Sequence, residues 1–172
     1  MVDVLTPAQR RLNMSRIRGR DTRPEMTIRR GLHACGFRYR LQDRALPGRP
    51  DLVFPRHRAV IFVHGCFWHG HDCPLFKLPG TRRGFWEAKI TSNRTRDERA
   101  VAALLEQRWR VATVWECSLR GTGKLGGDEV IRLCQAFLLS RETMQVNIRG
   151  MSRANEERQQ NVGEAVSKPG SA

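Results

Sequence analysis

The sequence predicts one α/β domain in which a mixed β-sheet is flanked by helices. Its 172 residues suit a single core, and a hydrophobic content of 40% is enough to build one. Short apolar runs typical of strands alternate with longer stretches of helical period, which indicates a sheet covered by helices. No apolar run approaches the roughly twenty residues that a membrane-spanning helix needs, so no membrane span is predicted.

Two helix starts are marked near the N-terminus. Thr6-Pro7-Ala8-Gln9 combines a capping residue, a proline in the first turn and a glutamine that can cap in return. This pattern predicts a short helix within a basic arm formed by residues 1–20. Thr22-Arg23-Pro24-Glu25 repeats the pattern, and the helix that it starts is expected to end at Gly36, because glycine is typical of that position.

A β-hairpin is expected next. Residues 37–41 alternate apolar and basic side chains, as a half-buried strand does. The apolar runs 51–54 and 59–63 follow, separated by a short polar segment, and predict two antiparallel strands. The second of these runs is apolar throughout, so we expect this strand to be buried.

The remaining elements complete the domain. Residues 85–107 predict a long helix, and residues 109–115 predict a strand that returns beside the hairpin through a right-handed crossover. Residues 128–139 predict a closing amphipathic helix. Because apolar residues become rare after Ser140, we expect the domain to span residues 1–140 and residues 141–172 to form a disordered tail.

The charge balance points to a polyanionic partner. The chain carries 31 Lys and Arg against 17 Asp and Glu, for a formal net charge of +14, and only four of the basic residues are lysines. Arginine binds phosphates through a planar fork of donors, so nucleic acid is the favoured partner and the arm of residues 1–20 is expected to contact DNA. The N-terminus has no apolar export signal and the number of cysteines is odd, which predicts a cytoplasmic protein with reduced thiols.

A possible zinc site follows the buried strand. Residues 64–73 hold three histidines and two cysteines within ten positions. Cys66, Cys73 and one histidine would need a fourth ligand, and Cys117 can supply it if its strand neighbours the hairpin. Spacing favours neither His69 nor His71 as the histidine ligand. The alternative interpretation is that the cysteines are reduced thiols packed as small apolar side chains.

A carboxylate and the remaining histidines suggest hydrolytic chemistry. Asp51 begins a strand beside the end of the next one, where His64 emerges, and could hold Mg²⁺ for phosphodiester cleavage. It is equally well explained as a strand-initiating residue after proline. A histidine that is not a zinc ligand could take a proton from water. Glu25 could lie near the metal or could only cap its helix.

Aromatic residues interleaved with arginines provide a third motif. Phe67-Trp68 lies in the histidine-rich segment, and Phe85-Trp86 begins the long helix just after Arg82 and Arg83. Such aromatics can wedge between base pairs, or they can form a small core around the zinc site. Trp68 and Trp86 are the better candidates for contact with bases.

Four sequence blocks resemble a known family. They are Leu46 to Asp51 (LPGRPD), Val60 to Cys73 (VIFVHGCFWHGHDC), Phe85-Trp86, and Trp109 to Gly121 (WRVATVWECSLRG). The chain closely resembles the very-short-patch repair (Vsr) DNA mismatch endonucleases from about Met14 to Gly121. Gly70 stands where this resemblance leads us to expect a histidine.

The resemblance implies a restriction-endonuclease-like fold with a structural zinc site. It implies Mg²⁺-dependent nicking of double-stranded DNA on the 5′ side of the thymine in a T·G mismatch, of the kind that deamination of 5-methylcytosine produces. The protein would act as a monomer, alongside other DNA repair proteins. A zinc-containing DNA-binding protein without catalytic activity is the competing hypothesis.

The resemblance also assigns residues to roles. Mg²⁺ would be held by Asp51 and the main-chain carbonyl of Val63. The attacking water would give its proton to His69, with His64 assisting at the phosphate and Glu25 near the hydrated metal. The implied zinc ligands are Cys66, His71, Cys73 and Cys117, and the implied DNA wedge is formed by Phe67, Trp68 and Trp86.

Overall fold

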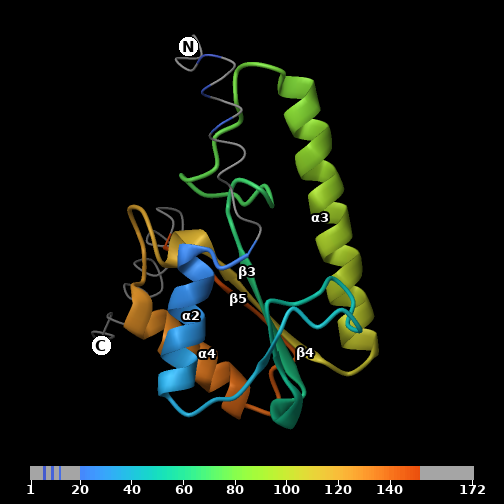
Figure 1. Ribbon diagram of the computed structural model, residues 1–172, viewed down its shortest axis with the longest axis vertical. Coiled ribbons are helices and arrows are strands. Elements are labelled where there is room, and N and C mark those ends of the chain that lie inside the picture. The colour runs from blue at the N-terminus through green and yellow to red at the C-terminus, as the bar shows by residue number, and fades with distance from the viewer. Residues whose placement is uncertain (1–5, 7–8, 10–11, 13–19, 152–172) are drawn as a thin grey trace, which may run out of the picture.

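The computed structural model describes residues 6, 9, 12 and 20–151 (Figure 1). Five strands form one sheet in the order β1-β2-β3-β4-β5, in which the first two pairings are antiparallel and the last two parallel. The predicted mixed sheet flanked by helices is therefore confirmed. Its elements are α2 (Arg23–Ala34), β1 (Arg40–Leu41), β2 (Leu52–Phe54), β3 (Ala59–His64), α3 (Arg83–Glu106), β4 (Arg110–Trp115), α4 (Gly127–Leu139) and β5 (Gln145–Ile148).

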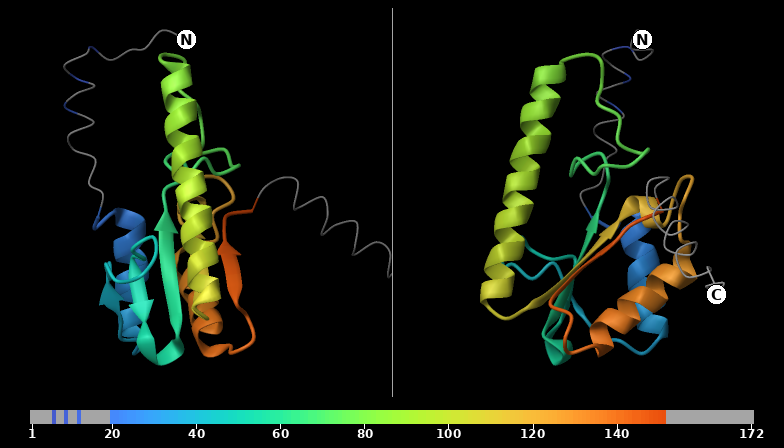
Figure 2. Two further views of the ribbon diagram at one scale, coloured as in Figure 1. Left: turned by 90° about the vertical axis from the view of Figure 1, so that its right-hand side faces the viewer. Right: turned by 180° about the vertical axis from the view of Figure 1, so that it is seen from behind.

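Helices cover both faces of the sheet. Figure 2 shows the long helix α3 on one side and α2 with α4 on the other. Because side chains alternate along a strand, neighbouring residues enter different cores. Leu52 and Phe54 pack under α2 and α4, whereas Val53 packs with Leu104 of α3. In the described part of the chain, no helix is both long and apolar enough to cross a membrane.

The strand register brings three chain segments to one end of the sheet. In the antiparallel pair β2 and β3, Leu52 lies opposite Ile61, so the residue before β2 is close to the last residues of β3. In the parallel pair β3 and β4, His64 lies opposite Trp115. The residues that follow β3 and β4 therefore leave the sheet side by side, as the hypothesis of a ligand after β4 requires.

The start of α2 follows the sequence prediction. Thr22 is the N-cap, and its Oγ1 accepts a hydrogen bond from the Glu25 N–H at 3.4 Å. The earlier capping motif is also formed, because Thr6 and Gln9 exchange hydrogen bonds of 2.9 and 3.2 Å. Most of the predicted basic arm, residues 1–20, lies outside the described residues.

The expected end of the domain at residue 140 is wrong. Residues 145–148 form β5, which pairs with β4, and Val146 and Ile148 pack against the core under α4. The chain then returns to the Cys117 segment, because the Gly150 N–H points at Cys117 Sγ at 3.4 Å. Only two of the four strand residues are apolar, so the pattern was too short to indicate a strand. The rest of the predicted tail, residues 152–172, lies outside the described residues.

Candidate functional site

Asp51 lies beside the last residues of β3. Its Oδ2 accepts a hydrogen bond from the Val63 N–H at 2.7 Å, which fixes the carboxylate at the end of the hairpin. Burial raises the pKa of Asp51 to about 6, although this hydrogen bond opposes the rise. The side chain is therefore an anchored carboxylate whose negative charge is poorly compensated by the protein.

Glu25 is the second carboxylate of this region. It lies in the first turn of α2 and is only 3% exposed. Its charge is one of the causes of the raised pKa of Asp51. Arg29 donates to Glu25 Oε1 at 3.4 Å and to Asp21 at 2.5 Å. Because the Glu25 charge disfavours ionisation of Asp51, a cation bound beside the two side chains would stabilise the ionised Asp51 carboxylate.

His64 and His69 form a stacked pair. Their ring centroids are 3.7 Å apart and their planes differ by 5°. His64 is 8% exposed, and burial, together with the neighbouring His69, lowers its pKa to about 3. His64 is therefore neutral near pH 7. Its Nδ1 is buried and has no hydrogen-bond partner among the described residues.

Asp97 of α3 is bound to this histidine pair, and it was not among the predicted residues. His69 Nδ1 lies 2.5 Å from Asp97 Oδ2. Because a carboxylate accepts, Nδ1 carries the proton of this hydrogen bond, and Nε2 is the nitrogen that has a lone pair when the ring is neutral. A signal existed in the sequence, since Asp97 follows the buried Ile90 by seven residues and precedes the buried Leu104 by seven. That spacing places it on the inward face of the helix.

The three side chains are better arranged for proton transfer than for metal binding. The donor atoms of His64, His69 and Asp97 lie within 4.8 Å of one another. However, the in-plane lone pairs of stacked imidazoles lie in two parallel planes, so the two rings cannot both point at one ion. Asp97 is also already bound to His69.

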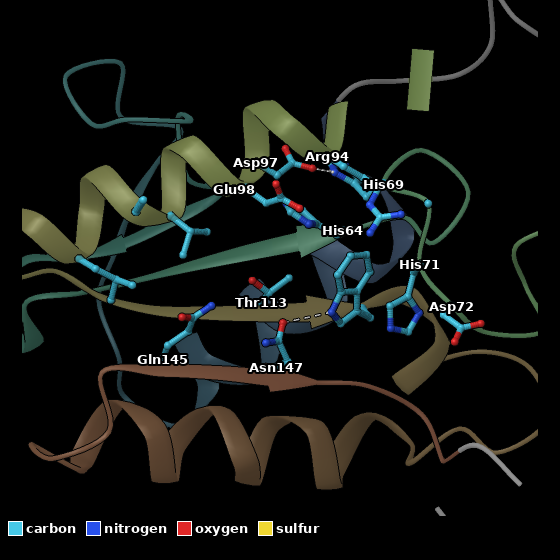
Figure 3. A pocket seen from close by; sticks show the side chains of 15 residues that line it. His64, His69, His71, Asp72, Arg94, Asp97, Glu98, Thr113, Gln145 and Asn147 are labelled. Atoms are coloured by element: carbon cyan, nitrogen blue, oxygen red, sulfur yellow. Dashed lines mark hydrogen bonds and ion pairs between the residues drawn. The ribbon is translucent and has the colours of Figure 1, made fainter. Parts of the chain in front are cut away.

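These groups line a cleft of about 580 Å³ between the hairpin and α3. Asp51, His64, His69 and Asp97 all face it, together with Arg96. A second hollow of about 540 Å³ lies between α3, β4 and β5 and shares both histidines and Asp97 (Figure 3). The structure thus brings the predicted Asp51, His64 and His69 together, with Glu25 close behind Asp51.

The four residues that the resemblance implies as zinc ligands also lie together. The donor atoms of Cys66, His71, Cys73 and Cys117 are all within 4.8 Å of one another. His71 Nδ1 is 3.7 Å from Cys66 Sγ and 3.6 Å from Cys117 Sγ. In a tetrahedral site with ordinary zinc distances, a nitrogen and a sulfur ligand are about 3.6 Å apart. The donor set and its spacing therefore fit Zn²⁺.

The chemistry of the thiols agrees with this fit. The hydrogen bond between the two buried thiols raises the pKa of Cys66 and lowers the pKa of Cys117, and His71 also lowers the pKa of Cys117. Thiolates bind metal, so a cysteine that loses its proton easily favours a metal site over simple packing. Cys134 differs, because burial under α4 raises its pKa to about 12.

Gly70 separates the two histidines that serve different sites. Its φ of +59° lies in the left-handed region, and a Cβ at this position would come within 2.6 Å of Ile90 Cγ2. A glycine here lets the turn direct His69 towards Asp97 and His71 towards the thiols. A histidine at this position would need a different turn or a displaced Ile90.

Replacing Gly70 by alanine is expected to lower the free energy of unfolding by about 1–3 kcal/mol, because of the positive φ and the overlap with Ile90. Urea denaturation measures this change. Gly84→Ala is the matched control, since a Cβ at Gly84 meets no atom within 4 Å and the residue lies in the first turn of α3. Equal stability of the two variants would contradict the strained turn.

Phe67, Trp68 and Trp86 form one aromatic cluster between the loop after β3 and the start of α3. Ring centroids are 5.1 Å apart for Phe67 and Trp68, 5.3 Å for Phe67 and Trp86, and 6.0 Å for Trp68 and Trp86. All three side chains are only partly buried. Phe85 continues the cluster and is 50% exposed. The molecule therefore presents an aromatic surface one residue away from His69.

Comparison with known proteins gives consistent matches. Residues 2–75 match the family model described as DNA mismatch endonuclease Vsr. The chain is 51% identical over 125 residues to the Type II nicking enzyme V.XorIIP of Xanthomonas oryzae pv. oryzae, which covers 73% of this chain and 92% of the relative. It is 46% identical over 138 residues to the DNA mismatch endonuclease Vsr of Escherichia coli, covering 80% and 88%. Identity to the Type II nicking enzyme V.NmeAIP of Neisseria meningitidis is 39% over 120 residues, covering 70% and 86%.

Proposed function

The chain belongs to the Vsr family of DNA mismatch endonucleases, and on that premise we propose that it nicks one strand of duplex DNA on the 5′ side of the thymine in a T·G mismatch. The observation that supports this proposal most directly is the single cleft that holds Asp51, His64 and His69. Relatives named nicking enzymes support cleavage of one strand. The mismatch would arise by deamination of 5-methylcytosine, and the protein would act as a monomer alongside other repair proteins.

A divalent cation fits the Asp51 end of the cleft. Asp51 and the main-chain carbonyl of Val63 would hold Mg²⁺, with Glu25 nearby, because anchored oxygen ligands and uncompensated negative charge suit a hard cation. Bound there, the ion supplies positive charge that polarises the phosphoryl oxygen and stabilises the leaving alkoxide. Cys66, His71, Cys73 and Cys117 would hold a structural Zn²⁺ that keeps the loop after β3 in place.

The histidines would handle the proton and the phosphate. Asp97 holds the His69 proton on Nδ1, so Nε2 can accept a proton from the attacking water. His64 stays neutral because burial lowers its pKa, so the one N–H of its ring can donate to a phosphate oxygen without bringing a positive charge. Both rings are held by stacking, which fixes their separation before the substrate arrives.

The aromatic cluster would recognise the distorted base pair. We assign Phe67, Trp68 and Trp86 to a wedge that enters the duplex beside the mismatch, because partly buried rings next to arginines can unstack a base step. A wobble pair is easier to open than a matched pair, since its neighbours stack less well. Trp68 precedes His69 directly in the chain, so a wedged duplex would lie with its backbone near the cleft.

Replacing Asp97 by asparagine is expected to lower the nicking rate about 10- to 100-fold, because the amide no longer selects the His69 tautomer with a free Nε2. Single-turnover kinetics on a T·G duplex measure the effect. Affinity for the uncleaved duplex is expected to stay within about threefold, since Asp97 reaches DNA only through His69. An unchanged rate would show that His69 does not need this carboxylate.

Cleavage of a panel of duplexes tests the proposed function. Each strand is labelled in a separate experiment, and each of the mismatches is placed in varied flanking sequence. Every duplex is tested with and without Mg²⁺. We expect a single nick 5′ to the thymine of T·G, only with the cation. Binding without cleavage of any duplex would instead support a non-catalytic zinc-containing DNA-binding protein.

A further inference from the structure

Arg96 is a cation in the cleft that the mechanism above does not use. Its side chain lines the same hollow as Asp51, His69 and Asp97. Among the described residues it makes no ion pair with either carboxylate, and its one hydrogen bond goes to an uncharged partner. An arginine beside acidic groups that remains unpaired keeps its charge and most of its donors for another anion.

Asn93 holds this arginine in place. Arg96 Nη2 donates to Asn93 Oδ1 at 2.6 Å, one turn earlier on the same face of α3. Asn93 is itself only 6% exposed, and its Nδ2 donates to the main-chain carbonyl of Trp68 at 2.8 Å. The amide is therefore fixed in one orientation, because turning it over would place two acceptors together and two donors together.

Arg96 is thus connected, through Asn93, to the loop segment that carries Phe67 and Trp68 of the aromatic cluster. Trp68 offers its carbonyl to Asn93, and the residue that follows it is His69. Asn93 fixes the distance between this segment and α3, while Arg96 extends from the same point into the cleft. A side chain with many rotamers is in this way held before an anion binds, which removes part of the entropy loss of binding.

Resting on the proposed function, we infer that Arg96 binds the phosphate at the scissile bond and that Asn93 is the positioning residue that holds Arg96 there. The planar guanidinium matches two phosphate oxygens with two parallel hydrogen bonds. Arg96 belongs to α3, whereas Asp51 lies at the end of the hairpin, and both line the cleft. A phosphate bound by Arg96 would therefore lie between α3 and the hairpin. Negative charge that develops on the phosphate oxygens during cleavage strengthens the contact.

Single-turnover nicking of a T·G duplex by the full chain tests this inference, with affinity measured separately without added Mg²⁺. Arg96→Ala is expected to lower the rate about 100-fold, the effect of removing one preorganised donor to a developing charge. Arg96→Lys is expected to recover part of that loss, because it restores the charge without the fork. Arg99→Ala removes the same charge from an exposed position of α3 outside the cleft, and its rate is expected to stay within about twofold of wild type.

The role of Asn93 is tested by a double-mutant cycle. Asn93→Leu removes both hydrogen bonds at similar volume and is expected to lower the rate about tenfold alone, but by a clearly smaller factor when Arg96 is already alanine. A purely structural role would lower the rate equally in both backgrounds. The melting temperature of each variant shows whether it is folded. If Asn93→Leu melts well below wild type, Asn93→Ala is used in its place.

Two outcomes separate this inference from the proposed function. If wild type nicks the T·G duplex but Arg96→Ala matches Arg99→Ala, Arg96 does not bind the reacting phosphate and the inference alone is wrong. Additive effects of Asn93→Leu and Arg96→Ala would remove the positioning role. A wild-type chain that nicks no mismatched duplex would remove the proposed function together with the inference.

Discussion

Asp51→Asn is expected to abolish nicking, with a rate at least about a thousandfold below wild type, because the cation that it would hold contributes several kcal/mol to the transition state. The amide keeps the size of the side chain but loses the charge that binds Mg²⁺. Single-turnover cleavage of a T·G duplex measures the rate. Asp128→Asn makes the same chemical change at an exposed position in the first turn of α4 and is expected to cleave normally.

Asp51→Asn is expected to be no less stable than wild type. A stable but inactive variant would show that activity is lost because the metal ligand is missing and not because the protein unfolds. The folded pKa of Asp51, about 6, is above its ordinary value of 3.8. Its contribution to stability is therefore greatest below about pH 4 and falls as the pH rises through 6, so at pH 7.5 the ionised group destabilises the metal-free protein. Melting at pH 7.5 without Mg²⁺ is expected to occur at the same or a higher temperature in Asp51→Asn. An inactive variant that melts far earlier, or one that keeps a tenth of the activity, would contradict this role.

Cys117→Ser is expected to lose bound zinc and to melt at least about 10 °C below wild type, because the free energy of binding a structural zinc ion is largely folding free energy. Cys117 follows β4, while its partners Cys66, His71 and Cys73 follow β3, so the ion would tie two strand ends together. Nicking is expected to fall with stability, since His69 lies in the segment that the ion would hold.

Metal analysis after dialysis and a melting curve give the two measurements. Cys35→Ser is the control, because Cys35 is exposed at the end of α2 and lies outside the cluster. We expect about one zinc per chain in the control and in wild type. Full zinc content in Cys117→Ser would exclude Cys117 from the ligand set.

The central strands and the helices could be predicted because their patterns are long and consistent. The strands β2, β3 and β4 are apolar runs at the expected positions, and α3 begins within two residues of its prediction. β5 could not be predicted, because Val146 and Ile148 gain their burial from α4 and β4, which are distant in the sequence. A short alternating pattern carries no information about such neighbours.

The candidate site was predictable in its residue types but not in its pairings. Spacing left His69 and His71 equivalent, and only the turn at Gly70 sends one ring to Asp97 and the other to the thiols. Asp97 is one of many charged residues in the sequence of a long helix, and nothing in the local pattern sets it apart as a partner of His69. Its partner comes from a loop 28 residues earlier, and such a contact depends on the folded chain rather than on local periodicity.

The return of the chain to the Cys117 segment decides where the protein can be shortened. A version cut after residue 140, or carrying a purification tag at that point, would leave β4 as an unprotected sheet edge and expose the apolar residues beneath α4 to self-association. It would also lose the Gly150 amide that faces the Cys117 sulfur. A shortened version of the protein should therefore keep all residues up to Met151, whose N–H donates a hydrogen bond to the Gly123 carbonyl.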